Sequence, residues 1–256
     1  DMNREKPLLL ISNDDGIAAK GLNELIRTLK GIGEMLVMAP ESPRSGYSMC
    51  FTTENAIHYE TIRQEEDLTV CKCNGTPTDC TKLGLYVLAP RVPDLVIGGI
   101  NHGDNSAVNV HYSGTMGVVK EGCLKGIPSV AYSLCNHHLD ADFTPTLPYV
   151  RTITEKVLQY GLPRGICLNI NFPDIPYYKG VKICRQTDGD WIKEFVPCVH
   201  PYRDHYFWVT GEYINFEPDA ENTDHWAMDH GYVAVTPTSI DVTAYHFMEE
   251  LKDWHL

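Results

Sequence analysis

Two adjacent carboxylates, Asp14 and Asp15, come just after the apolar run Leu8–Ile11 near the beginning of the chain. Four consecutive apolar residues are typical of a strand that is buried on both faces. Carboxylates at the end of such a strand lose solvation and repel each other, and a divalent cation beside them offsets both effects. The pair therefore indicates a metal site. A plain Asx-turn that ends the strand before Gly16 is the structural alternative.

The segment Ser113-Gly114-Thr115 is the second candidate for chemistry. It precedes apolar residues at helical spacing over 118–124, which predicts that it opens a helix. The first backbone N–H groups of a helix lack partners and the helix dipole favours negative charge, so this end could bind a phosphate. A simple Ser or Thr cap is the structural alternative.

The surrounding elements are expected to bring these residues together. Helical spacing over Gly21–Lys30 and the buried strand Met35–Ala39 complete a β-α-β unit, whose second strand runs parallel to the first. Asp94–Gly98 predicts another buried strand, followed by a turn-rich loop over 99–105. Loops at the carboxyl ends of parallel strands converge on one crevice. The loops after these three strands hold Asp14 with Asp15, Ser45, and Asn101.

The donors in those loops are all oxygen atoms. Such a set favours one divalent cation, Mg²⁺ or Mn²⁺, with Ca²⁺ as a further candidate in a crystal, over zinc. A zinc site of Cys and His is a weak alternative, because His137-His138 and the pair His200 and His205 have no partner at metal-ligand spacing. A metal beside a phosphate cradle indicates hydrolysis of a phosphate ester, with one of the two aspartates as general base.

Composition narrows the class of protein. The 256 residues carry a net charge of −13, which argues against duplex nucleic acid as a partner. The nine cysteines lack a CxxC pair and are expected to be reduced thiols. The N-terminal residues 1–6 are polar and no apolar run is long enough to span a membrane, so we expect a cytoplasmic protein without a membrane partner.

The remaining pattern predicts an α/β fold: a Rossmann-like, largely parallel sheet flanked by helices, with β-hairpin insertions and a C-terminal extension. The further strands and helices are expected as a hairpin over 51–73, a helix capped by Thr76 that runs to about Leu88, a strand over 129–133, a helix over 148–160, a strand over 167–171, an antiparallel β arm over 181–216 with turns at 188–190 and 201–204, a loop or short helix over 222–230, a strand over 231–235 and a helix over 243–254. The aromatic residues of the arm suggest a subunit contact, with ordinary core packing as the alternative. We expect residues 1–135 to form the core with the metal site, and 136–256 to complete it and supply the arm and terminal helix for oligomerisation.

Six motifs together resemble the survival protein SurE family of 5′-nucleotidases. In chain order they are Ser12-Asn13-Asp14-Asp15-Gly16, Ala39-Pro40 with Arg44-Ser45-Gly46, Gly75-Thr76-Pro77-Thr78-Asp79-Cys80, Gly99-Ile100-Asn101 with Gly103 and Asn105, Tyr112-Ser113-Gly114-Thr115, and Thr236-Pro237 with Asp241-Val242-Thr243. They cover nearly the whole chain. The loop 103–111 departs from the glycine-proline or glycine-leucine version common in the family, which leaves the substrate preference open.

The resemblance implies a metal-dependent phosphatase that acts on nucleoside monophosphates, assembled as a homodimer or homotetramer by exchange of C-terminal elements. It leaves 3′-nucleotidase and exopolyphosphatase activity open. The metal ligands it implies are Asp14, Asp15, Ser45 and Asn101. Its phosphate-binding segment falls on Ser113, Gly114 and Thr115, and Asn13, Gly46 and Asn105 are expected to position ligands or phosphate.

Two other functions stay open on the sequence. A phosphatase that forms a covalent aspartyl-phosphate usually has Asp-x-Asp after its first strand, whereas Asp14 and Asp15 are adjacent. A non-catalytic nucleotide-binding module of Rossmann type needs Gly-x-Gly-x-x-Gly after that strand, and residues 13–21 lack it.

Overall fold

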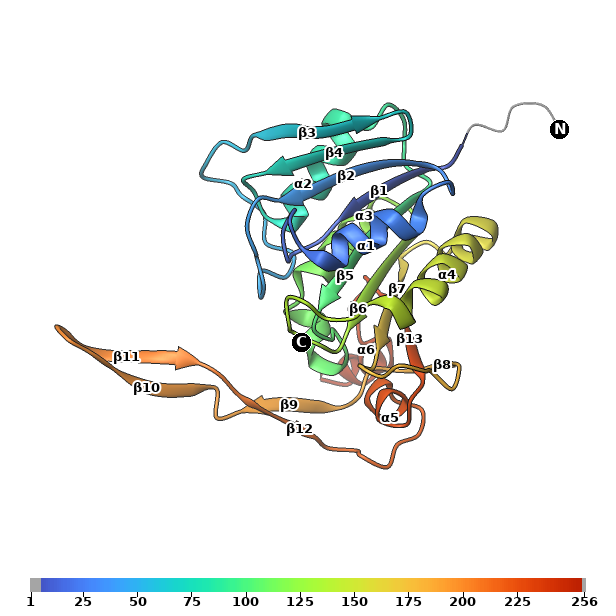
Figure 1. Cartoon of the computed structure of the whole chain (residues 1–256). Coiled ribbons are helices and arrows are strands. Elements are labelled where there is room, and N and C mark those ends of the chain that lie inside the picture. Colours follow the sequence, from blue (N-terminus) through green and yellow to red (C-terminus); the bar gives the residue numbers. More distant parts are fainter. Residues whose placement is uncertain (1–5, 255–256) are drawn as a thin grey trace.

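The body of the protein is a nine-stranded sheet within residues 6–254, the part of the chain that the computed structural model describes (Figure 1). The parallel strands are β1 (Leu8–Ser12), β2 (Glu34–Pro40), β4 (Leu68–Cys73), β5 (Leu95–His102), β6 (Ser129–Leu134) and β7 (Ile166–Phe172). The sheet is extended by β3 (Tyr59–Glu65), β13 (Val233–Ser239) and β8 (Val181–Ile183), in the order β3-β4-β2-β1-β5-β6-β7-β13-β8. The predicted largely parallel α/β fold is confirmed.

Strand β1 lies at the centre of two hydrophobic clusters. Leu9 and Ile11 face α1 (Lys20–Leu29) and α4 (Leu147–Tyr160), whereas Leu8 and Leu10 face α3 (Gly114–Leu124). Successive side chains of a strand point to opposite faces, so a run of four apolar residues fills both layers. Helix α2 (Pro77–Leu83), capped by Thr76 as expected, packs beside α3 and continues into a π-helical turn over 84–88.

The strand order reverses between β1 and β5. From β1 the chain builds the sheet outward through β2 and β4, and then returns to β5 and builds the other half through β6 and β7. Ligands of open α/β sheets bind outside the carboxyl ends of the strands at such a reversal. The segments that follow β1 and β5 are therefore the place to look for a site.

The loop predicted over 99–105 is in part wrong, because β5 continues to His102. Asn101 pairs with Ser133 of β6 after a register shift, so it lies on the strand and not in a loop. Small and polar residues that usually mark a loop are accommodated here because the neighbouring strand β6 supplies the pairing. The expected hairpin is formed by β3 and β4, but residues 51–58 contain no strand.

A long antiparallel ribbon leaves the body after β8 (Figure 1). It consists of β9 (Gly189–Ile192) paired with β12 (Glu212–Asn215), and β10 (Phe195–His200) paired with β11 (Arg203–Val209); residues 189–215 are called the arm below. The antiparallel excursion expected over 181–216 is confirmed over 189–215, and so is the turn at 201–204; residues 181–183 are instead β8 of the central sheet, where they pair parallel with β13. The turn predicted at 188–190 is wrong, because Gly189 already pairs with Asn215.

The chain closes with α5 (Asp224–Asp229), β13 and α6 (Tyr245–Lys252). None of the helices in residues 6–254 combines the length and apolar character that crossing a membrane requires. The polar N-terminal residues 1–5 noted above lie outside the described part of the chain.

Candidate active site

Asp14 and Asp15 stand on the tight turn that follows β1. Asp14 is only 4% exposed, and Asp15 is partly buried. The turn depends on Gly16, whose φ of +97° lies in the region that side chains rarely adopt. The backbone N–H of Arg44 donates to the carbonyl of Asp14 at 2.7 Å, and this bond ties the loop that carries Ser45 to the two aspartates.

Burial raises the pKa of both carboxyl groups to about 6. For Asp14 the charge of Asp15 adds to the effect of burial, and a hydrogen bond from Thr115 opposes it. For Asp15 the backbone N–H of His102, which donates to Oδ2 at 2.9 Å, and the nearby His137 oppose the effect of burial. Among the ion pairs of the described residues, none includes either aspartate. One buried and one partly buried carboxylate, neither of them in any ion pair described above, fit a site for a metal ion.

The side-chain oxygen of Asn101 lies on the same side of the sheet edge as the carboxyl group of Asp14, because Thr115 contacts both. Asn101 Nδ2 donates to the carbonyl of Gly103 at 2.9 Å, which directs the side-chain oxygen toward Thr115, whose Oγ1 lies 3.4 Å away. Asp14, Ser45 and Asn101 all line one cavity of about 280 Å³, called the site cavity below. The donors gathered here are carboxylate, hydroxyl and amide oxygens, which suit a hard divalent cation.

The N-terminus of α3 lies directly against Asp14. Ser113 caps the helix by accepting the N–H of Met116 at 2.9 Å, and it also lines the site cavity. A Cβ on Gly114 would lie 2.7 Å from the Cβ of Asp14, so only glycine lets the helix end come this close. Thr115 Oγ1 donates to Asp14 Oδ1 at 2.6 Å, so in this structure its hydroxyl orients the carboxylate.

The other expected phosphate-positioning residues lie in different surroundings. Gly46 and Asn105 line the site cavity. The side chain of Asn13 instead bonds the backbone of Gly16 twice, through Nδ2 to the carbonyl and through Oδ1 to the N–H. The side chain of Asn13 thereby closes the turn after β1, and a contact of this amide with phosphate would have to break those bonds.

A buried amide network holds Asn105 in place. Its Nδ2 donates to Ser133 at 2.7 Å, its backbone N–H donates to Asn171 at 2.8 Å, and its carbonyl accepts from Asn169 at 2.8 Å. Both of these β7 residues are fully buried. Polar side chains buried in a parallel strand could have been noticed in the motif Asn169-Ile170-Asn171, which sequence reasoning took only as a strand.

Sequence reasoning missed the rim of the site cavity, which is lined by His102, Asp104, Asn109, Tyr112, His137 and Trp191. Asp104 accepts the hydroxyl of Ser106, and His102 packs edge-on against Phe143. Trp191 comes from the arm, more than 170 residues after Asp14. No local pattern signals such an approach, because it depends on where the arm leaves the body.

Asp224, at the beginning of α5, connects the rim to the base of the arm. This buried carboxylate accepts the N–H of Ala107 through Oδ2 at 2.9 Å. Through Oδ1 it accepts both the N–H and the hydroxyl of Thr187, and the N–H of His225. It therefore fixes the loop over 105–112, which includes the 3₁₀ helix Ala107–His111, relative to the segment that leads into the arm.

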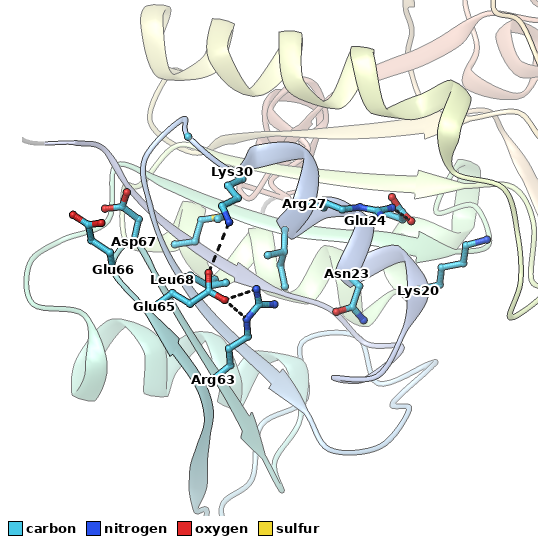
Figure 2. Close-up of a pocket in the computed structure, with 13 residues that line it drawn as sticks. Lys20, Asn23, Glu24, Arg27, Lys30, Arg63, Glu65, Glu66, Asp67 and Leu68 are labelled. Atoms are coloured by element: carbon cyan, nitrogen blue, oxygen red, sulfur yellow. Dashed lines mark hydrogen bonds and ion pairs between the residues drawn. The ribbon is translucent and has the colours of Figure 1, made fainter.

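A second cavity, of about 740 Å³, lies between α1 and the β3–β4 hairpin (Figure 2). Its charged side chains are largely paired with one another: Arg63 with Glu65 at 2.5 Å, Lys30 with Glu65 at 3.9 Å, and Arg27 with Glu24. None of the expected site residues lines it. The size of this cavity alone therefore does not make it the candidate site.

The cysteines do not form a metal site. All nine are free within the described residues, and that part of the chain contains no group of three or more His, Cys, Asp or Glu side chains that could hold a metal. A zinc site of Cys and His is therefore not found there. The expected site differs from such a group, because two of its four expected ligands, Ser45 and Asn101, carry neutral oxygens.

The fold and the site together define an α/β protein with an oxygen-lined pocket at the reversal point of a parallel sheet, beside a helix N-terminus. The chain belongs to the survival protein SurE family, whose model matches residues 9–193. A relative named 5′-nucleotidase SurE from Phocaeicola vulgatus is 66% identical over 255 residues, covering 100% of this chain and 99% of its own length. A relative of the same name from Bacteroides thetaiotaomicron is 56% identical over 253 residues, covering 99% of this chain and 98% of its own. The crystal structure of the SurE protein from Aquifex aeolicus matches with a TM-score of 0.83 at 35% identity, covering 98% of this chain and 100% of that one. The predicted resemblance is confirmed.

Proposed function

We propose that this protein hydrolyses nucleoside 5′-monophosphates to nucleoside and phosphate with the help of one divalent cation, Mg²⁺ or Mn²⁺. The observation that carries the proposal is the convergence of Asp14, Ser45 and Asn101 with the N-terminus of α3 on one cavity. The relatives named 5′-nucleotidase SurE, which align over nearly the full chain, support the substrate class.

Asp14, Asp15, Ser45 and Asn101 would hold the cation. When bound, the cation supplies positive charge to the phosphate and lowers the pKa of a water molecule. The N-terminal turn of α3, with Ser113 and Gly114, binds the phosphoryl oxygens through backbone N–H groups that have no partner within the helix. The same groups stabilise the charge that develops on these oxygens during the reaction.

One of the two aspartates accepts the proton of the attacking water. Asp15 Oδ2 accepts the N–H of His102, which leaves Oδ1 for this proton. Asp14 Oδ1 accepts the hydrogen bond of the Thr115 hydroxyl, which leaves Oδ2 of Asp14 as the oxygen that can accept the proton. Thr115 thereby orients the carboxylate beside the phosphate, whether Asp14 acts as ligand, as base or as both.

The test is phosphate release from a panel of nucleoside 5′- and 3′-monophosphates and polyphosphate, after chelation and with Mg²⁺, Mn²⁺ or Ca²⁺ added back. We expect release from 5′-monophosphates to be lost on chelation and restored by Mg²⁺ or Mn²⁺. Nucleotide binding without turnover under every metal would instead support a binding module, and a trapped phosphoaspartate would support the covalent mechanism.

We further propose that residues 136–256 complete the core and supply an oligomer contact, and that the protein works as a homodimer or homotetramer in a reducing, cytoplasmic environment. The arm exposes large apolar side chains, among them Val199 and Trp208, and α6 buries no residue in the single chain. The nine free thiols support a reducing environment. Sedimentation of the full chain, compared with a variant in which residues 195–209 are replaced by a short turn, tests the contact; a monomer in both would refute it.

A further inference from the structure

One side chain of the arm reaches the site cavity. Trp191 of β9 lines the cavity together with Asp14 and Ser113, and no other residue of the arm within the described chain does so. Its Nε1 donates to Asn109 Oδ1 at 2.8 Å, and Asn109 lines the cavity as well. The indole therefore belongs to the wall of the candidate active site, although it comes from an element that projects away from the body.

The indole is held in one orientation from behind. Trp191 pairs across the ribbon with Tyr213, and the two rings meet edge to face with centroids 5.8 Å apart. Tyr213 in turn stacks on His225, with centroids 4.6 Å apart and the ring planes 24° from parallel. A Cβ on Gly211 would lie 2.8 Å from Cε3 of the indole, so glycine is needed for the backbone to lie this close to the ring. A ring fixed in this way loses little conformational freedom when a ligand packs against it.

Tyr112 adds a second aromatic side chain to the same wall. It is 54% exposed, it lines the cavity, and it immediately precedes Ser113 at the phosphate end of α3. An exposed aromatic side chain beside a phosphate-binding helix end suits a ligand that carries a phosphate at one end and a flat ring at the other. Aromatic side chains bind nucleobases by stacking and accept any base, because every base has a π face.

We propose that Trp191, assisted by Tyr112, is the platform on which the nucleobase of the substrate stacks, so that the arm sets the preference for nucleotides over base-free phosphate esters. This inference rests on the proposed nucleotidase function and makes it more specific. It assigns Trp191 a contact with substrate, whereas ordinary packing at the base of the arm would make the residue purely structural.

The experiment compares AMP with ribose 5-phosphate, which has the same phosphate and sugar but no base. Trp191→Leu should raise KM for AMP roughly 5- to 100-fold with kcat within about twofold, the range that loss of one stacking contact produces. Its kinetics with ribose 5-phosphate should stay within about twofold of the parent. Trp191→Phe, which keeps a ring but not the donor to Asn109, should recover most of the affinity for AMP.

Trp226→Leu is the matched control, since Trp226 lies on α5, outside the cavity and outside the arm proposed as the oligomer contact. Thermal unfolding of each variant reports whether the fold is retained. An equal loss with AMP and ribose 5-phosphate in Trp191→Leu, or no change with either, would overturn the platform.

A turnover-independent measurement separates this inference from the proposed function. Calorimetric binding of adenosine to the metal-loaded parent and to Trp191→Leu needs no hydrolysis. If the parent hydrolyses neither ester, the nucleotidase proposal fails, yet weaker adenosine binding in the variant would still support the platform. Equal adenosine binding by parent and variant would refute it.

Discussion

The turn after β1 and the arm contribute side chains to the same cavity, but they hold those side chains in different ways. Asp14 is buried beneath the N-terminus of α3, and its carbonyl is bonded to the loop that carries Ser45. Trp191 belongs to a two-stranded ribbon whose outer part, β10 and β11, is mostly exposed on both faces. A ribbon of two strands is marginal by itself. The arm is positioned mainly at its base.

The difference in support matches the different roles proposed for these side chains. Groups that bind a metal and a phosphate need precise placement, and the residues proposed for these roles lie on strand and helix ends that the core fixes. A group that stacks on a base tolerates more variation, and it comes from a peripheral element. The two regions meet through Asn105, Asn109 and Asp224, which are bonded to the core, to Trp191 and to Thr187 respectively. The following predictions test how separate the two regions are.

The largest effect is expected at the buried carboxylate. Asp14→Asn keeps an oxygen to accept from Thr115 but removes a negative charge from the proposed cation site. We expect turnover to fall by more than about a hundredfold, the scale for loss of a metal-binding or general-base group. Metal-dependent phosphate release measures it, and thermal unfolding should show a folded protein. Activity near that of the parent in both Asp14→Asn and Asp15→Asn would refute the site.

A smaller loss is expected from Gly114→Ala at the close contact between α3 and the turn. The added Cβ would lie 2.7 Å from the Cβ of Asp14, so the helix end or the aspartate must move. A shift of about 1 Å at a catalytic group can lower activity about a hundredfold, so we expect roughly a 10- to 100-fold loss in kcat/KM. Gly122→Ala on the same helix would place its Cβ 2.6 Å from Ser129 Oγ, away from Asp14, so it controls for a displacement of α3 that does not begin at the contact with the turn. Equal losses in both variants would contradict a specific role of Gly114.

Sequence patterns predicted the parts of the site that local physics determines. The apolar run of β1 and the aspartates after it define a strand end, and Ser113 defines a helix end, so both could be located without the structure. The glycines two residues to either side of Asn101, Gly99 and Gly103, favour a loop, and only the pairing with β6 shows that Asn101 lies on a strand. The metal and phosphate roles of these residues stay predictions.

Contacts between residues that are far apart in the sequence could not be predicted from local patterns. Nothing within ten residues of Trp191 indicates that it meets Asn109, and nothing near Asp224 indicates that it bonds Ala107. Both contacts depend on the packing of α5 and the arm base against the loop over 105–112. A local sequence window carries information on strand, helix and turn preference, but not on which distant backbone donors a buried carboxylate will satisfy.

A substitution of Asp224 should weaken the connection between the arm base and the loop over 105–112. Asp224→Asn replaces one acceptor oxygen with a donor, so either Ala107 or Thr187 loses a buried partner. Leaving one buried donor unpaired costs about 1–3 kcal/mol of folding free energy. We expect a lower midpoint of thermal unfolding and a higher KM for AMP, with a smaller change in kcat than Asp14→Asn gives.

The exposed Asp219 is the control for Asp224, since Asp219→Asn removes the same charge nearby. If Asp224→Asn lowered kcat as much as Asp14→Asn, the arm base and the turn after β1 would act as one unit and not as two separate regions.

The smallest predicted effect is the change in the stability of the metal-free protein with pH. Burial raises the pKa of Asp14 and Asp15 to about 6, whereas an unfolded Asp titrates near about 3.9. Between these values the folded protein binds more protons than the unfolded chain, so the stability that these groups contribute falls as pH rises from about 4 to above 6. Thermal unfolding in chelator should show this decline when Asp14→Asn is subtracted from the parent, and Mg²⁺ or Mn²⁺ should offset it at pH 7.

The stability that Asp94 contributes should depend on pH in the opposite direction in the same experiment. Burial acts to raise its pKa, but hydrogen bonds from Arg91 and from the N–H of Leu8 outweigh it and lower the pKa below the usual value. Asp94 therefore stabilises the fold above the unfolded pKa and loses that contribution as pH falls through its folded pKa. The parent minus Asp94→Asn should gain stability with rising pH where the parent minus Asp14→Asn loses it. Curves of the same sign would show that burial does not govern the aspartate pair, and that its carboxylates are stabilised in the fold without a cation.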